Sequence, residues 1–95
     1  MGAHTFSLHV NGDMTAQEAY SMAVEDAIYE HGNDSYNGTI STTRGFKILS
    51  SKPLSREDAR KRAARAIDDG EVEKWEAAGA IRTKEGWLFV GWAAS

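Results

Sequence analysis

Three histidines are the side chains of this sequence that could bind a metal ion or carry a proton at neutral pH. His4 and His9 lie five positions apart in a segment that alternates like a strand, so they point to opposite faces and cannot share one ion. His9, His31 and Asp34 could meet only if a helix end returned to that strand. Their spacing matches no metal motif. We therefore predict no metal site and no cofactor.

Patterns that indicate catalysis are absent from the rest of the chain. It has no Ser/His/Asp signature, no phosphate-binding glycine loop and no paired carboxylates. It contains no cysteine, which excludes disulfides and thiolate metal ligands. These absences favour a protein that is not an enzyme and has no catalytic residues. A small ligand- or nucleotide-binding protein that uses His9, His31 and Tyr36 is kept as an alternative.

A cluster of basic residues is the next candidate site. The formal net charge of the 95 residues is −3, yet one ten-residue window holds five bases. These are Arg56, Arg60, Lys61, Arg62 and Arg65. They could neutralise the acidic first helix, if the two helices lie side by side, or they could bind nucleic acid through phosphate contacts.

The stretch "YNGTIST" is rich in hydroxyl and amide side chains. Asn37-Gly38 is a strong turn dipeptide, and Thr39 and Ser41 would share one face of the strand that follows. We name Tyr36, Asn37, Thr39 and Ser41 as a candidate polar rim of a partner-binding surface. Ordinary solvent exposure is the alternative.

Two segments of the chain begin in the same way and predict helices at about 16–31 and 56–69. Thr15 and Ser55 are good N-caps, and each is followed three positions later by an acid, Glu18 or Asp58, as in a capping box. Each helix is followed by a matching run, "ISTTRGFKIL" or "IRTKEGWLFV", that predicts a β-hairpin. An internal duplication of a helix–hairpin unit would explain these matches.

These elements predict a single α+β domain over residues 1–95. It consists of a strand within 1–13, one helix–hairpin unit over 14–50 and a second over 54–95. The order βαββαββ is that of a ferredoxin-like sheet with one strand appended. We therefore predict two helices on one face of a five-stranded, mainly antiparallel sheet. Because 14 of the residues are alanine, the core should be thin.

The final strand, "GWLFVGWAAS", is apolar on both faces, which is typical of a strand covered on both sides. Helices on one face would leave the other side of this strand open. The cover could be residues 70–79 of the same chain, a second copy in a homodimer, or another protein. In the last two cases Trp87 and Trp92 would be the anchors of the interface.

"YNGTIST", "GWLFVGWA" and the helix–hairpin plan resemble small accessory proteins of tailed bacteriophages. The resemblance implies a binder or inhibitor of a host factor, and it carries over no catalytic residue. It also implies a location in the host cytoplasm.

We therefore predict a non-enzymatic protein-interaction module whose partner is another protein or a second copy. Nucleic-acid binding through the basic helix is the main alternative. No segment approaches the roughly 20 apolar residues that span a bilayer, and no signal sequence is recognisable. We accordingly expect no membrane partner and a cytoplasmic location.

Overall fold

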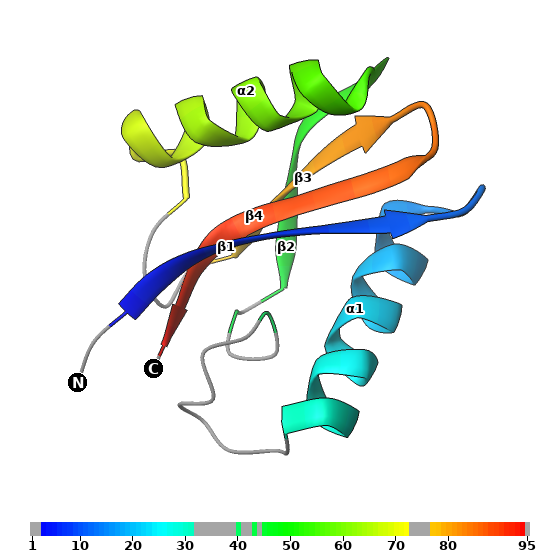
Figure 1. Ribbon diagram of the computed structural model, residues 1–95, viewed down its shortest axis with the longest axis vertical. Coiled ribbons are helices and arrows are strands. Elements are labelled where there is room, and N and C mark those ends of the chain that lie inside the picture. Colours follow the sequence, from blue (N-terminus) through cyan, green and yellow to red (C-terminus); the bar gives the residue numbers. More distant parts are fainter. Residues whose placement is uncertain (1–2, 32–39, 41–42, 44, 73–76, 95) are drawn as a thin grey trace.

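The structure is a computed structural model that describes residues 3–31, 40, 43, 45–72 and 77–94. Two helices and four strands make up this part of the chain (Figure 1). They are β1 (Ala3–Asn11), α1 (Ala16–His31), β2 (Phe46–Leu54), α2 (Arg56–Asp68), β3 (Ala78–Thr83) and β4 (Gly86–Ala94). The α+β class and the bounds of both helices agree with the prediction.

Both helices begin at the predicted caps. Thr15 Oγ1 accepts a hydrogen bond from the Glu18 backbone N–H at 3.2 Å, and a Glu18 carboxylate oxygen accepts from the Thr15 N–H at 3.0 Å. These two bonds complete a capping box. The pKa of Glu18 is lowered because its carboxylate accepts from both the N–H and the hydroxyl of Thr15. At α2, Ser55 Oγ accepts from the Asp58 N–H at 3.2 Å. The described residues include no return bond from the shorter Asp58 side chain.

The prediction of a hairpin in the first half is wrong. Ile40 lies in a 3₁₀ turn, and its carbonyl accepts a hydrogen bond from the Thr43 N–H. The one described strand of this region, β2, begins only at Phe46. The second hairpin is confirmed, since β3 and β4 pair antiparallel. Four strands therefore form the described sheet, not five, and the two halves of the chain differ in architecture.

The sheet order is β1-β4-β3-β2, with β1 and β2 at the two edges. β4 pairs antiparallel with β1 and with β3, whereas β2 pairs parallel with β3. The sheet is therefore mixed and has four described strands, so the predicted five-stranded, ferredoxin-like sheet is wrong.

The helices cover opposite faces of the sheet, not one face as predicted (Figure 1). The connection through α1 leads from one edge strand to the other, and the connection through α2 leads back toward the centre. Connections between parallel strands are nearly always right-handed. Two such connections that cross the sheet in opposite directions place their helices on opposite faces. Placing both helices on one face was therefore the error, and it arose because the strand order was not known.

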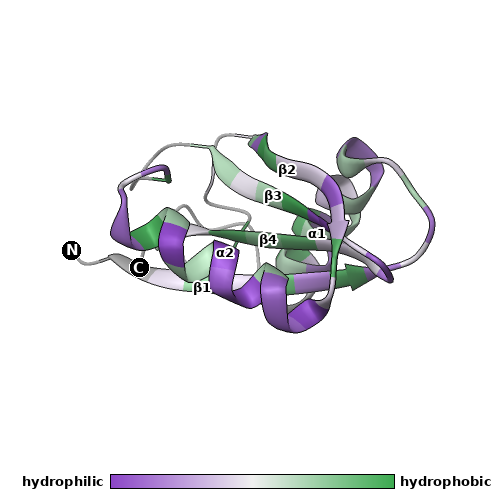
Figure 2. Ribbon diagram, turned by 90° about the horizontal axis from the view of Figure 1, so that it is seen from above, coloured by the Kyte–Doolittle hydropathy of each residue, from purple (hydrophilic) through white to green (hydrophobic). Residues whose placement is uncertain are grey.

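Strand β4 is the centre of two hydrophobic clusters. Trp87 and Phe89 pack on the α1 side with the small alanines of that helix, while Leu88 and Val90 pack on the α2 side with Ala59 and Ala63. Figure 2, seen from the α2 side, shows hydrophobic colours along β4 beneath a helix that carries many hydrophilic residues. The chain's own helices therefore cover both faces of this strand. This removes the need for an outside cover, which followed from placing both helices on one face.

Candidate functional site

Strand β1 forms one edge of the sheet and pairs on its inner side with β4. The pairing is continuous from Ala3 opposite Ala94 to Asn11 opposite Gly86. On its outer side no strand of the described chain is paired with it. The nine residues "AHTFSLHVN" include no lysine, arginine, aspartate, glutamate or proline. A long, regular edge without these residues can pair with a further strand, because its outer N–H and C=O groups are unpaired.

Strand β2, the opposite edge, has several features that oppose such pairing. It contains Lys47, Lys52 and Pro53, and its register with β3 shifts between Ile48 and Ser50 and again before Leu54. Charged side chains, proline and irregular register are the usual protections of an edge strand. The two edges therefore differ, and β1 is the one left open to a partner.

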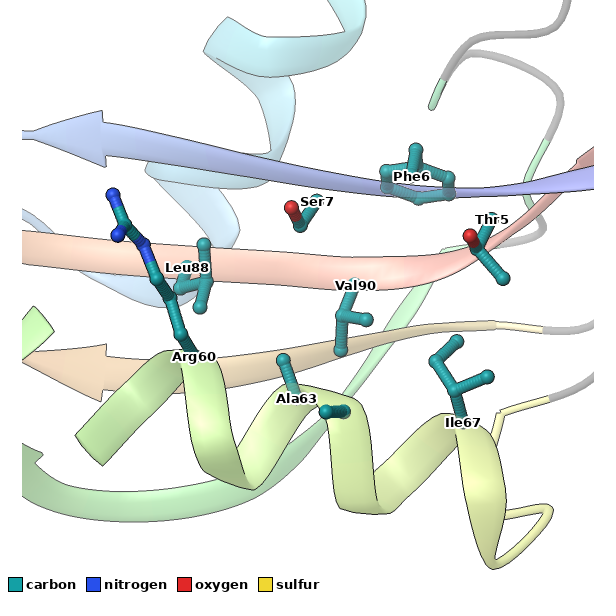
Figure 3. Close-up of a pocket in the computed structure, with 9 residues that line it drawn as sticks. Thr5, Phe6, Ser7, Arg60, Ala63, Ile67, Leu88 and Val90 are labelled. Atoms are coloured by element: carbon teal, nitrogen blue, oxygen red, sulfur yellow. The ribbon is translucent and has the colours of Figure 1, made fainter. Parts of the chain in front are cut away.

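A groove of about 360 Å³ lies between β1 and α2 (Figure 3). Leu88 and Val90 of β4 form its apolar floor. Thr5 and Ser7 line the β1 side, and Arg60 and Ile67 line the helix side. The groove is open for two reasons. Helix α2 lies mainly over β3 and β4 and does not extend over the edge strand β1. The β1 side chains that line the groove, Thr5 and Ser7, are too small to fill the space.

Four of the five basic residues of α2 are paired with acids. Arg62 makes a bidentate pair with Glu71, in which Nη1 and Nη2 each lie 2.8 Å from a carboxylate oxygen. These hydrogen bonds lower the pKa of Glu71 and raise that of Arg62. The other pairs join Arg56 to Glu85 at 3.9 Å, Lys61 to Glu57 at 3.8 Å and Arg65 to Asp69 at 3.8 Å.

Arg60, which lines the groove, has no acidic partner among the described residues. The acids that neutralise α2 come from the helix itself and from the segments that follow α2 and β3, not from α1, because α1 lies on the other face. Only Arg62 uses its donors in hydrogen bonds to its acid; the other three described pairs are ion pairs at 3.8–3.9 Å between exposed side chains. Their acids offset much of the positive charge of α2, so the described residues provide little specific support for nucleic-acid binding.

The two tryptophans proposed as anchors differ in position. Trp87 is 6% exposed, and its indole N–H donates to the Met14 carbonyl at 2.9 Å. The Arg82 guanidinium donates to the same carbonyl at 3.1 Å and lies 5.3 Å from the Trp87 ring centre. Trp87 is thus part of the interior. Trp92 is half-buried, and it shares the α2 side of the sheet with Thr5, its partner in register.

The other predicted site residues cannot be placed beside the groove. Tyr36, Asn37, Thr39 and Ser41 lie outside the described residues, as do Asp34 and the 73–76 part of the predicted cover. No group of three potential metal ligands occurs in the described ranges. Within those same ranges, no helix is long and apolar enough to cross a membrane.

His9 is hydrogen-bonded across the end of the sheet to a buried threonine. Thr83 Oγ1 accepts from the Gly86 N–H at 2.9 Å and lies 2.7 Å from His9 Nε2. Either atom of this pair can be the donor, because the neutral imidazole nitrogen and the hydroxyl can each donate or accept. Burial of the ring and the positive charge of Arg56 lower the pKa of His9, and Glu85 opposes them.

This pair predicts a loss of stability in mild acid. Below the ordinary pKa of 6.5, the unfolded chain takes up a proton that folded His9 does not bind until its own lower pKa is reached. The free energy of unfolding should therefore decrease as the pH is lowered across that interval. His9→Gln, whose side-chain oxygen can accept from Thr83, should show a smaller fall. Melting temperatures of both proteins between about pH 7.5 and 5 test this, and identical pH dependences would contradict it.

The signal for this site was present in the sequence but was not used. The absence of charge from "AHTFSLHVN" and the lysines and proline of "FKILSSKPL" are visible without a structure. They become informative once the pairing shows that both strands are edges. Comparisons of the chain with models of protein families, with curated proteins and with solved structures give no match.

Proposed function

We propose that this protein is a non-enzymatic protein-interaction module that adds an extended segment of a partner to the free edge of β1. The observation that carries the proposal is the contrast between an uncharged, regular edge at β1 and an irregular, lysine- and proline-containing edge at β2. Strand addition derives its affinity from backbone hydrogen bonds and its specificity from the side chains that alternate on the two faces.

The side chains around β1 support this role. Leu8, in the middle of the strand, is 38% exposed although it lies opposite the buried Phe89. An added strand would place a neighbour beside Leu8 and remove part of this apolar surface from water. Half-buried Trp92 lies one strand further in, on the side of the sheet that carries the groove. The bacteriophage resemblance, which implies a binder of a host factor, agrees in kind with this proposal and stays a prediction.

The proposal is tested with peptides selected from a random nine-residue display library on the immobilised protein. Bound peptides should protect backbone amides of β1 from hydrogen exchange and leave those of β2 unchanged. Leu8→Lys should weaken binding about tenfold, because it removes an apolar contact and places a charge at the edge. Fluorescence polarisation of a labelled peptide measures the change.

Ile48→Lys is the matched control, since Ile48 is an exposed apolar residue, 53% accessible, on the opposite edge strand. It should leave peptide affinity unchanged. Circular dichroism melting confirms that both variants fold. Failure to select any peptide, protection at β2, or equal effects of the two substitutions would contradict binding at β1.

A further inference from the structure

We infer that the segment received by β1 is acidic and alternating, with apolar side chains toward the α1 face and a carboxylate on the α2 face that pairs with Arg60. This inference rests on the proposed function. It specifies which side chains the partner carries, whereas pairing at the free edge alone depends only on backbone groups.

The alternation follows from the register of β1. Leu8 pairs with Phe89 on the α1 side of the sheet, and Ser7 pairs with Val90 on the α2 side. Directly opposite residues of neighbouring strands share a face, so a further strand continues the pattern outward. Its residues on the α1 side would stand beside Leu8. Its residues on the α2 side would stand beside Ser7 and the groove.

The acidic preference follows from Arg60. This residue lines the groove with Thr5 and Ser7, and Figure 3 shows its side chain extending from α2 past Leu88 toward β1. Each of the other basic residues of α2 lies within 3.9 Å of a carboxylate, whereas Arg60 has no such partner among the described residues. A guanidinium beside an apolar floor favours an anion that reaches it over the short side chains of β1.

A second copy of β1 would not supply this anion. If two β1 strands paired antiparallel about Ser7, the residues flanking the centre on the groove side would be Thr5 and His9 of the other copy. The strand contains no aspartate or glutamate, so Arg60 would remain without a partner. The charge at the groove therefore favours an acidic segment of another protein over self-association.

The test uses three fluorescein-labelled nine-residue peptides that alternate valine with glutamate, glutamine or lysine. The glutamate peptide should bind more tightly than the glutamine peptide, and the lysine peptide should bind most weakly. Arg60→Gln should weaken binding of the glutamate peptide about fivefold, as expected for a partly exposed ion pair, and leave the glutamine peptide unchanged. Arg60→Glu should reverse the preference, so that the lysine peptide binds best.

Arg65→Gln is the matched control because it makes the same charge change on α2 at a residue that is paired with Asp69 and does not line the groove. It should leave all three affinities unchanged. Equal binding of the glutamate and glutamine peptides would overturn the acidic preference while supporting edge addition. Binding of none of the peptides would contradict edge addition itself. A dimer of the chain alone, abolished by Leu8→Lys, would assign the edge to a second copy and overturn the inference.

Discussion

Replacing Phe89 with alanine should lower the free energy of unfolding by about 3–5 kcal/mol, the usual cost of removing a buried phenylalanine. Phe89 is 0% exposed at the middle of β4. Its ring meets Tyr20 and Phe46 edge-to-face, with ring centres 5.8 and 6.3 Å apart. The helix that covers it contributes mainly alanines, which are too short to fill the space left by the ring. We therefore expect little relaxation of the cavity.

Urea denaturation followed by circular dichroism measures this loss. Domains of this size have stabilities of about 5–15 kcal/mol, so a loss of this size should move the unfolding midpoint of Phe89→Ala to a clearly lower urea concentration. Ile48→Ala is a suitable control, because this side chain is largely exposed on the same side of the sheet. It should change stability by less than about 0.5 kcal/mol. Comparable losses in the two variants would show that the α1-side cluster is not the main core.

Gly86→Ala should destabilise the fold by about 3 kcal/mol, at the upper end of the usual cost of overpacking. A methyl group at this position would overlap the carbonyl oxygen of Val10 and lie 3.0 Å from the Asn11 Cα. Both are backbone atoms of β1, so the overlap is relieved only if the end of the β1–β4 pairing opens. The Gly86 N–H also donates to Thr83, which ties the same residue to the His9 hydrogen bond.

Gly79→Ala in the neighbouring strand is the comparison for this prediction. An added methyl there would meet the Leu49 side chain, which can rotate, and would lie 3.1 Å from a methyl of Val72. We expect a clearly smaller loss than for Gly86→Ala. Thermal melting of the two variants gives the order, and the reverse order would contradict the close approach of β1 to the β3–β4 hairpin.

Local patterns predicted the elements whose signals are local. The N-caps at Thr15 and Ser55 mark the starts of both helices, and the alternation of 4–10 marks β1. The hairpin around Gly86 was predicted for the same reason. Each of these features depends on residues only a few positions apart.

The features that were predicted wrongly depend on distant partners. "ISTTRGFKIL" has the pattern of a hairpin, but the strand in it pairs parallel with β3 and continues through Pro53 to Leu54. Proline and lysines are tolerated there because β2 is an edge strand, which nothing local reveals. The strand order also decided the faces of the helices. That β1 is an edge strand could not be recognised until this order was known, although its uncharged composition could.

The pairing of β1 with β4 has a consequence for how the protein is made. The sheet neighbour of β1 is β4, which begins only at Gly86, so β1 is synthesised long before it can be paired. Until then both of its sides are open, and its uncharged, aggregation-prone character is unshielded. A molecule that recognises the outer edge of β1 in the finished protein could therefore meet the same residues on the nascent chain, and association at that stage would compete directly with closure of the sheet.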